Sequence, residues 1–418
     1  MSDFINGRRV MRENLDEQER IDELYTSKGL IPPSSRANNA APSQTVTANE
    51  QQGQNAPVLN QTSTDNKCPS CGATLAFDPK TGGMICNFCG SSVAINAANA
   101  VPGRGYTFNE ITNNAANRIT NSSNKIITCG TCGGKFMADP SAISGLCPYC
   151  GSNSITVSGS AEGMLQPTGV IPFQVDKERA QRILKDWLSR RRFAPMDLTK
   201  NSEIMDLVGV YVPYWMFDCD TFTHYKGKFG KTVGSGDDQY TKYHKAEGNC
   251  ELPVKDLTIV ASSRLANDAY WKKVSKFNLD YMRNYDPNLL AGFWSESYSI
   301  DGQAAWQTAM GKIYNLIRGR IMRLEDADVI AKIDMQPEAV NIRAKYVLAP
   351  VWITSFNYSG GIFQVLINGQ TGCVEGTWPK SFKRVFRTIG IVIGAIFGTL
   401  FLRALIMQFV SWITALGG

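Results

Sequence analysis

Residues 68–90 read CPSCGATLAFDPKTGGMICNFCG, and residues 129–151 read CGTCGGKFMADPSAISGLCPYCG. Both stretches carry the cysteine pattern C-x2-C-x14-C-x2-C, and the second pattern begins 61 residues after the first. The dipeptide Asp-Pro recurs at the equivalent place in each stretch, so the second stretch repeats the first. The repeat accounts for eight of the eleven cysteines, which are Cys68, Cys71, Cys86, Cys89, Cys129, Cys132, Cys147 and Cys150.

The spacing of each cysteine quartet is typical of a structural zinc site. Zn2+ favours four tetrahedral thiolates, and two C-x2-C turns supply them. A glycine follows each C-x2-C pair, at positions 72, 90, 133 and 151, and glycine accepts the left-handed conformation that such a turn requires. The sequence therefore predicts two zinc ribbons, at residues 67–95 and 126–157, with one structural Zn2+ in each.

Two other uses of these thiols fit the sequence less well. The N-terminus, Met1-Ser2-Asp3-Phe4, lacks the apolar core of a signal peptide, so we expect reduced cysteines in the cytoplasm and no disulfide framework. A catalytic zinc keeps one coordination position open for water, and four sulfur ligands leave none. The expected role of the metal is therefore structural.

The C-terminal segment predicts a membrane anchor. Basic residues at positions 383, 384 and 387 precede an apolar stretch at residues 388–416, in which Arg403 is the single charged residue. A spanning helix needs about 20 residues, so the stretch fits one transmembrane helix. Basic residues before the span favour a cytoplasmic N-terminal side. We expect a single-pass membrane protein with a C-terminal anchor and a cytoplasmic soluble part. The alternative is a buried or surface helix, which the all-round apolar character disfavours.

Three glycines within this helix, Gly390, Gly394 and Gly398, recur at four-residue spacing. Small residues at this spacing let two membrane helices approach closely. The pattern predicts a homo-oligomer, or a contact with another membrane helix, although glycine is also common in membrane helices without such a contact.

The remaining sequence divides by composition. Residues 1–66 are mostly polar and predict a disordered region, with a helix at residues 10–26, and residues 96–125 predict a linker. Residues 167–380 are long enough to form their own core and predict a cytosolic α+β domain that is β-rich and largely antiparallel. The predicted fold class is thus multidomain: two zinc ribbons, this central domain and one transmembrane helix.

Periodicity places the elements of the central domain. Apolar spacing predicts helices at Lys177–Arg192 and Gln303–Met322. The Asn368-Gly369 dipeptide predicts a hairpin. Strands are expected at Val208–Phe217, Phe222–Phe229, Tyr240–Ala246, Val329–Met335, Ile342–Tyr358 and Ile362–Ile367.

The central domain offers no recognisable catalytic arrangement. Gly230-Lys231-Thr232 looks like the end of a phosphate-binding loop, but Tyr225 stands where that motif needs glycine. No nucleophile and base can be paired by spacing. Four further residues carry metal-binding atoms and are expected to be ordinary strand residues: Cys219, His224, His244 and Cys250.

The charge distribution argues against nucleic acid as a partner. The 418-residue chain has a formal net charge of +6, but residues 67–160, which hold both ribbons, carry only 6 basic and 3 acidic residues. A dedicated nucleic-acid-binding module concentrates Lys and Arg where it touches phosphate.

Over residues 67–405 the chain resembles bacterial membrane-anchored proteins with two TFIIB-type zinc ribbons, which are often labelled as replication-restart primosomal helicase-like. Beside the cysteine quartets and the basic-then-apolar tail, the resemblance rests on GVIPF at 169–173, GVYVPYW at 209–215, LAPVW at 348–352 and NGQTG at 368–372. It implies partners from envelope-stress machinery, such as flotillin-like or phage-shock-type proteins.

These observations favour a non-enzymatic membrane-anchored zinc-binding platform that recruits or scaffolds cytosolic proteins at the membrane, in envelope stress as the resemblance implies. The alternative is a membrane-associated nucleic-acid-binding protein that uses its ribbons. A membrane-bound enzyme is a third hypothesis, for which the sequence offers no recognisable arrangement of catalytic residues.

Overall fold

The computed structural model describes residues 67–95, 105–113, 119, 125–138, 146–191, 193–195, 198, 207–266 and 268–416. The region predicted as disordered, 1–66 with its helix, lies outside the described residues. In chain order the described strands and helices are β1 (Leu75–Asp78), β2 (Gly83–Cys86), β3 (Ser92–Val93), β4 (Tyr106–Thr107), α3 (Phe108–Asn113), β5 (Lys125–Cys129), β6 (Lys135–Ala138), β7 (Ile155–Ser160), β8 (Gly169–Val170), α4 (Lys177–Ser189), β9 (Val208–Val233), β10 (Tyr240–Val260), α6 (Trp271–Val274), β11 (Arg283–Asn284), β12 (Trp294–Glu296), α7 (Gly302–Leu324), β13 (Val329–Tyr358), β14 (Gly361–Asn368), β15 (Val374–Gly376) and α8 (Phe382–Leu416), with short 3-10 helices at Gly236–Asp238, Leu279–Tyr281 and Pro287–Leu290.

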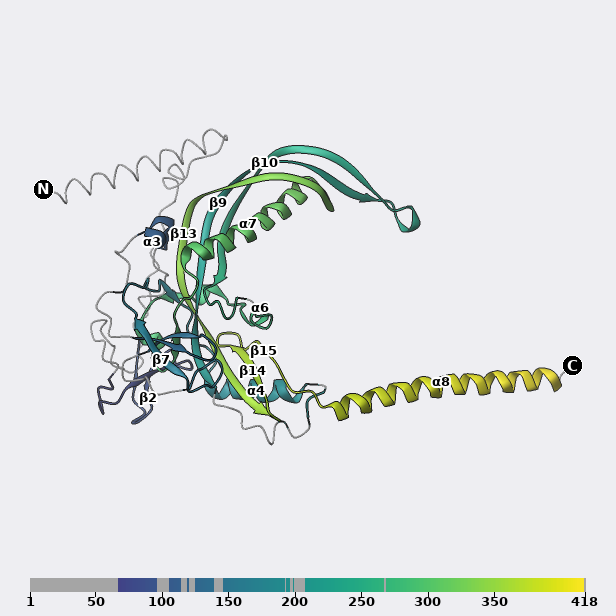
Figure 1. Cartoon of the computed structure of the whole chain (residues 1–418), viewed down its shortest axis with the longest axis horizontal. Coiled ribbons are helices and arrows are strands. Elements are labelled where there is room, and N and C mark those ends of the chain that lie inside the picture. Colours follow the sequence, from purple (N-terminus) through teal and green to yellow (C-terminus); the bar gives the residue numbers. More distant parts are fainter. Residues whose placement is uncertain are drawn as a thin grey trace, which may run out of the picture.

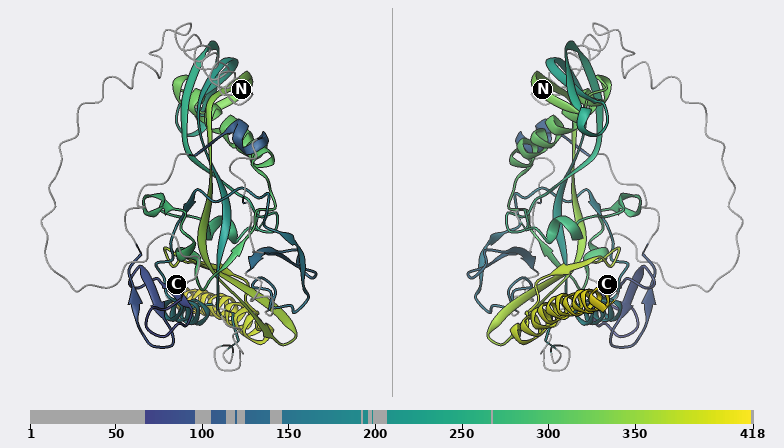
Figure 2. Two further views of the ribbon diagram at one scale, coloured as in Figure 1. Left: turned by 90° about the vertical axis from the view of Figure 1, so that its left-hand side faces the viewer. Right: turned by 90° about the vertical axis from the view of Figure 1, so that its right-hand side faces the viewer.

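The described residues form a body from which two long features project (Figure 1). One is a curved arm built from the distal halves of β9, β10 and β13, and the other is helix α8. Figure 2 shows that the ribbon around β2 and the ribbon around β7 lie on opposite sides of the body.

Most of the described strands belong to one mixed sheet. Its order is β11-β8-β13-β9-β12-β6-β5-β7, and β4, β10, β14 and β15 pair along its sides, which gives 12 strands among the described residues. Most neighbours are antiparallel, but β8 runs parallel to β13 and β12 runs parallel to β9. Strands β1, β2 and β3 form a separate three-stranded sheet. The central domain is therefore β-rich and mixed.

The arm exists because three strands are unusually long. β9, β10 and β13 contain 26, 21 and 30 residues, whereas strands of 3–10 residues are typical. Helix α7 covers one face of the arm with Ala305, Ala309, Ile313, Ile317 and Ile321, which recur every four residues and are buried. One apolar helix stripe against one sheet face gives the arm its core.

The strands bend at irregular pairings. The register shifts between Val254 and Leu257 in β10 and between Val340 and Arg343 in β13. Asp256 and Asn341 lie in these two shifts with φ of 54° and 56°, a left-handed conformation that Asp and Asn tolerate better than most residues. Bulges of this kind bend a strand and increase its twist, and Figure 1 shows the resulting curve.

Several predicted elements are confirmed with different limits. The helices expected at Lys177–Arg192 and Gln303–Met322 are α4 and α7. The two strands expected at Val329–Met335 and Ile342–Tyr358 are one strand, β13, because the bulge at Val340 and Arg343 lets pairing continue where the pattern breaks. The predictions at Val208–Phe217 and Phe222–Phe229 likewise merge into one strand, β9, which stays paired while the extra residues of the bulges lie on β10 and β13.

Parts of the segment predicted as a linker belong to the body. Within 96–125, β4 pairs with β13, and α3 follows it directly. Phe108 of α3 makes an edge-to-face contact with Trp306 of α7, with ring centroids 5.9 Å apart. Residues 105–113, which lie between the two ribbons in the sequence, therefore pack against the central domain.

Helix α8 projects from the body. Residues Val385–Gln408 form a 24-residue stretch that is long and apolar enough to cross a membrane, and none of it is buried. The helix starts at Phe382, before the predicted start at residue 388, so it includes the basic residues that precede the apolar stretch. An unburied apolar helix of this length is suited to be a membrane anchor.

Candidate metal centres

Each cysteine quartet converges on one point. In the first ribbon the sulfurs of Cys68 and Cys89 lie 3.5 Å apart, as do those of Cys71 and Cys86. In the second ribbon the equivalent distances are 3.7 Å for Cys129 and Cys150 and 3.6 Å for Cys132 and Cys147. All four sulfurs of each quartet lie within 4.8 Å of one another.

These distances fit a metal ion and exclude disulfides. A disulfide requires sulfurs about 2.05 Å apart, and all eight cysteines are free. Four sulfurs at about 2.3 Å from a tetrahedral Zn2+ would lie about 3.8 Å from one another. Both quartets therefore have the size and donor set of a four-thiolate metal site.

The same local turn builds each half of each site. The amide of the glycine after each C-x2-C pair donates to the carbonyl oxygen of the first cysteine of that pair, at 2.8–2.9 Å. Those glycines are Gly72, Gly90, Gly133 and Gly151, with φ between 67° and 75°. Left-handed φ favours glycine, so the sequence pattern and the turn geometry agree.

The thiols of the two sites differ in their surroundings. In the first ribbon Cys71 and Cys89 are exposed, and a hydrogen bond with the Ser91 hydroxyl, 3.1 Å from the sulfur, lowers the pKa of Cys89 to about 6. In the second ribbon burial raises the pKa of the Cys147 thiol. Shifts in both directions occur at both sites, because the pKa of Cys71 in the first ribbon is raised to about 12 and that of Cys129 in the second is lowered to about 7. The thiolate is the metal-binding form, so each site relies on the ion to hold some of its thiols deprotonated.

The second ribbon is joined to the central sheet. Its strand β6 pairs with β12, with Phe136 opposite Glu296, and the rings of Phe136 and Trp294 meet edge to face with centroids 5.6 Å apart. The Ser297 amide also donates to the Lys135 carbonyl oxygen at 3.0 Å. Backbone pairing and aromatic packing thus make this ribbon an extension of the body.

Tyr149, which lies between Cys147 and Cys150 of the second quartet, is buried in the body. Only 1% of this residue is exposed. Its hydroxyl donates to Glu296 Oε2 at 2.5 Å, and the Ser262 hydroxyl donates to Glu296 Oε1 at 2.7 Å. Its carbonyl oxygen accepts from Ser355 Oγ at 3.1 Å and from Gln364 Nε2 at 2.6 Å. Both polar ends of Tyr149 are therefore satisfied inside the protein.

A buried carboxyl and a guanidinium complete this contact. Burial raises the pKa of Glu296 to about 7, although two hydroxyls donate to it. The guanidinium carbon of Arg264 lies 4.4 Å from the centre of the Tyr149 ring, a cation–π distance, and Arg264 Nη2 donates to Gln364 at 3.1 Å. Burial raises the pKa of the Cys132 thiol, and the Arg264 charge opposes that shift. Arg264 therefore provides positive charge beside the second quartet.

The first ribbon makes fewer attachments. The Phe77 amide donates to the Ala291 carbonyl oxygen at 3.0 Å, and the Phe77 and Phe293 rings lie 6.5 Å apart. Lys80 Nζ and Glu178 of α4 form an ion pair at 3.1 Å, with both side chains more than half exposed. An exposed pair of this kind contributes about 0–1 kcal/mol.

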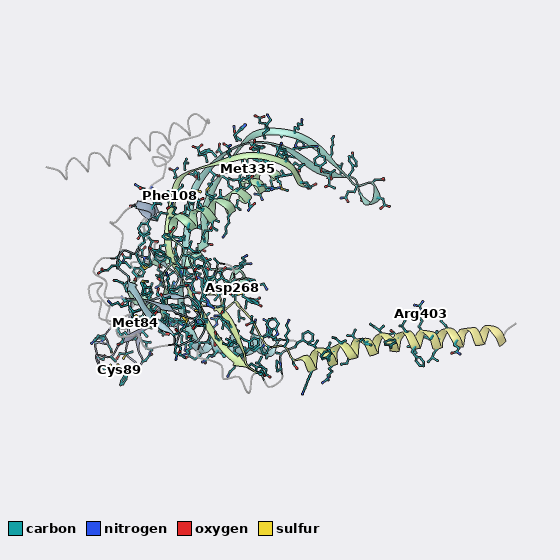
Figure 3. All side chains as sticks on the ribbon, in the orientation of Figure 1. Met84, Cys89, Phe108, Asp268, Met335 and Arg403 are labelled. Carbon is teal, nitrogen blue, oxygen red and sulfur yellow. The ribbon has the colours of Figure 1, made fainter. Side chains whose placement is uncertain are left out.

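The residue equivalent to Tyr149 in the first ribbon is Phe88. Both residues lie one position before the last cysteine of their quartet. Phe88 is 90% exposed. Figure 3 places its neighbour Cys89 at the outer edge of the body, on the side away from α8. The same turn thus presents an aromatic ring to solvent in one ribbon and buries it in the other.

The other residues considered as metal ligands remain apart. The two quartets are the groups of Cys, His, Asp and Glu that converge on a point within the described residues. His224 contacts Asn249 and Glu247, His244 contacts Glu325, and Cys219 and Cys250 are buried. Gly230-Lys231-Thr232 lies within β9, and a 3-10 turn at Gly236–Asp238 and then β10 follow where a phosphate-binding loop would need an α-helix.

Sequence reasoning missed the residues that receive Tyr149. Ser262 and Arg264 lie in one segment and Glu296 in another, both more than 100 residues beyond the ribbon, and no short motif contains all three. A weak signal was present, because the second ribbon reads CPYC where the first reads CNFC. A tyrosine hydroxyl that is buried needs a partner, whereas phenylalanine does not.

Comparison with known proteins identifies one distant relative. The chain is 25% identical over 346 residues to the uncharacterized protein YdjG of Bacillus subtilis (strain 168), and the match covers 82% of this chain and 97% of YdjG. No family model and no solved structure matches the chain. The match over nearly the whole of YdjG indicates a distant homologue, and with the two cysteine quartets it agrees with a pair of zinc ribbons.

Proposed function

We propose that this protein is a non-enzymatic, membrane-anchored platform that holds two structural Zn2+ ions and recruits cytosolic proteins to the membrane. The observation that carries the proposal is the contrast between Phe88 and Tyr149. The second ribbon is part of the body, whereas the first presents the equivalent aromatic ring to solvent. An exposed aromatic ring on a small rigid module is the kind of side chain that anchors a protein interface.

Zinc is the ion we assign to both sites. Four thiolates favour Zn2+ over Mg2+ or Ca2+, which prefer oxygen ligands, and the sulfur spacing matches a tetrahedral site. Such a site leaves no position for substrate or water. The metals then stabilise the ribbons and take part in no reaction, which agrees with a protein that binds partners.

Helix α8 supplies the membrane attachment in this proposal. The basic residues Lys383 and Arg387 precede the apolar stretch, so the ribbons and central domain lie on the cytoplasmic side. Carbonate extraction tests this attachment separately. The intact chain is expected in the membrane pellet, and a chain lacking residues 381–418 is expected in the supernatant. Extraction of the intact chain would contradict the anchor.

The recruiting surface is tested by substitution at Phe88. Full-length protein carrying an affinity tag is purified from membranes with its partners, and the partners are quantified by mass spectrometry. Phe88→Ser should lose partners that the unmodified protein retains. Val157→Ser on the second ribbon removes a half-exposed apolar residue and is the matched control. Identical partners in all three preparations would contradict recruitment through the first ribbon. Flotillin-like and phage-shock-type proteins are the partner classes we propose.

The nucleic-acid alternative makes an opposite prediction. With weak charge on the ribbons, we expect a dissociation constant no tighter than about 10⁻⁵ M at physiological salt, in the non-specific range. A sequence-dependent affinity near 10⁻⁸ M would favour nucleic-acid binding as the function.

The glycines of α8 are proposed to mediate an oligomer. An added Cβ at Gly390, Gly394 or Gly398 would meet no atom within 4 Å in the single chain, so this face is open. Gly394→Ile should therefore leave folding and insertion intact while it weakens helix association, because close approach in lipid depends on small residues. Cross-linking in membranes measures this. Equal cross-linking of the two proteins would show that any oligomer forms elsewhere.

A further inference from the structure

Arg191, two residues after the end of α4, packs on two tryptophan rings. Its guanidinium carbon lies 4.0 Å from the centre of the Trp187 ring and 4.8 Å from that of the Trp378 ring, both cation–π distances. The two rings meet edge to face with centroids 5.6 Å apart, and Trp187 is only 6% exposed. Two stiff side chains from distant parts of the chain therefore fix the place of this charge.

The charge of Arg191 has no partner within the described part of the protein. No carboxylate there pairs with it, whereas the adjacent Arg190 is paired with Asp186 at 2.6 Å. Arg191 Nε and Trp187 Nε1 are buried and meet no acceptor among the described residues. Arg191 as a whole is only partly buried, so its terminal nitrogens are the donors that an outside acceptor can reach. An anion is the group that such a guanidinium binds.

This guanidinium lies at the base of α8, and Figure 1 shows α4 beside the point where α8 begins. The Ser381 amide donates to the Phe193 carbonyl oxygen at 2.8 Å, and the Val385 amide donates to the Ser381 carbonyl oxygen at 3.1 Å. The apolar part of α8 begins between Val385 and Thr388, which is about 6–10 Å beyond Ser381 along a helix. Headgroups occupy about 5–8 Å on each side of the hydrocarbon core. In a bilayer that α8 spans, the end of α4 therefore lies at the level of the lipid headgroups.

The surroundings of Arg191 suit the membrane–water interface. Residues 190–192 contain three basic residues and residues 380–387 contain four, and neither segment contains an acidic one. The hydrogen bond between Ser381 and Phe193 brings the two segments together. Clusters of about four to eight Lys and Arg beside a spanning helix favour anionic lipids, and tryptophan is enriched at headgroup level. Position, charge and ring type thus all point to a lipid headgroup.

We propose that Arg191, with Trp187 and Trp378, binds the phosphate of an anionic phospholipid in the bilayer that α8 spans. The inference rests on the proposed anchor and names the lipid class that it prefers. A guanidinium presents parallel N–H donors that match two phosphate oxygens, so the contact is specific as well as charged.

Lipid binding at Arg191 also affects the first ribbon. Helix α4 has 13 residues and is therefore about 20 Å long, and near its other end Glu178 pairs with Lys80 of that ribbon. A lipid held at Arg191 thus limits how far the first ribbon lies from the membrane.

Photo-cross-linking in lipid nanodiscs tests the contact. The full-length protein carries a benzophenone amino acid in place of Phe193, and the discs contain phosphatidylglycerol and phosphatidylcholine in equal amounts. Lipid adducts are identified by mass spectrometry, and the ratio of the two adducts gives the lipid preference. Phosphatidylglycerol should be enriched, and Arg191→Gln should reduce that enrichment about fivefold, the contribution of one arginine near an anionic surface.

Arg190→Gln is the matched control. It removes the same charge one residue away, but Arg190 is 76% exposed and already paired with Asp186, so the enrichment should stay unchanged. Arg191→Lys keeps the charge but loses the planar fork, so its enrichment should lie between those of the unmodified protein and Arg191→Gln. An enrichment in Arg191→Lys as low as in Arg191→Gln would mean that packing of α4 decides the adducts, which would contradict the proposal.

A second probe, in place of Phe401 of α8, separates the anchor from the lipid site. It should give adducts with both lipids in every variant. Absence of these adducts in the unmodified protein would refute the anchor, and the Arg191 contact with it. Adducts at position 401 without enrichment at position 193 would refute the Arg191 contact alone.

Three further results would overturn the proposal. One is equal enrichment in the unmodified protein and Arg191→Gln. Another is an equal loss in Arg190→Gln and Arg191→Gln, which would reduce the effect to general surface charge. The third is displacement of the adducts by millimolar inorganic phosphate at constant ionic strength, which would assign Arg191 to a soluble phosphate compound.

Discussion

The two ribbons have the same ligands, the same spacing and the same glycine turns, yet they differ in what surrounds the metal site. The second ribbon shares backbone pairing with β12 and buries Tyr149 against Glu296. The first forms its own three-stranded sheet and exposes Phe88 at the equivalent position. The same cysteine pattern thus builds two quartets of one geometry, while the aromatic residue beside the last cysteine is buried in the second ribbon and exposed in the first. In the function proposed above, this residue separates a ribbon that serves the fold from one that is free to bind a partner.

The largest expected difference comes from removing the two aromatic rings. Tyr149→Ala deletes a buried ring and leaves Glu296 Oε2 without its donor, so it should lower the free energy of unfolding by about 3–5 kcal/mol. For a domain of this size that lowers the melting temperature by about 10 °C. Phe88→Ala should change the free energy by less than about 0.5 kcal/mol. Thermal unfolding in detergent measures both changes. Equal destabilisation by the two variants would contradict the claim that Tyr149 supports the fold and Phe88 does not.

A smaller effect should follow from pH through Glu296. Its folded pKa of about 7 lies above the ordinary value of 4.5, so the folded state binds more proton than the unfolded state between these values. Stability therefore falls as pH rises through this window, by roughly 3 kcal/mol in total.

The variant Glu296→Gln isolates this term. Urea unfolding of both proteins at pH 5 and pH 8.5 gives the pH dependence of each, and other titrating groups, the metal thiols included, contribute equally to both. The unmodified protein should lose more stability than Glu296→Gln between the two pH values. A parallel pH dependence in the two proteins would show that Glu296 is ionised at no cost.

Much of this structure could be predicted from sequence, because local patterns carry it. The cysteine spacing predicted the two quartets that converge, the apolar period predicted α4 and α7, and the apolar stretch with its single charged residue, Arg403, predicted α8. The unusual length of β9 and β13 could not be predicted, since polar residues alternate along the arm and a bulge at Val340 hides the continuity.

The attachment of the second ribbon to the central sheet could not be predicted from the sequence either, because its two strands are far apart in the chain and one is very short. Strands β6 and β12 are more than 150 residues apart in the chain, and β12 has only three residues. No period can be recognised over three residues. Pairing of this kind is decided by tertiary packing, here by the aromatic contact between Phe136 and Trp294.

The smallest expected change in stability concerns the ion pair of the first ribbon. Lys80→Ala removes the ion pair with Glu178, whose side chains are both exposed, so the free energy of unfolding should change by less than about 0.5 kcal/mol. Urea unfolding measures this. A loss of more than about 2 kcal/mol would mean that the first ribbon is held as firmly as the second.

The most direct test compares metal loss at the two sites by hydrogen exchange. Cys68→Ser and Cys129→Ser should each reduce the zinc content, measured by atomic absorption, from two ions per chain to one. In Cys68→Ser, faster exchange should be confined to residues 67–95. In Cys129→Ser it should also reach β12 and the strands beside it, because β6 pairs there and Tyr149 is anchored beneath it. Exchange that stays local in both variants, or reaches β12 from the first ribbon alone, would contradict the division of the two ribbons into a structural and an available one.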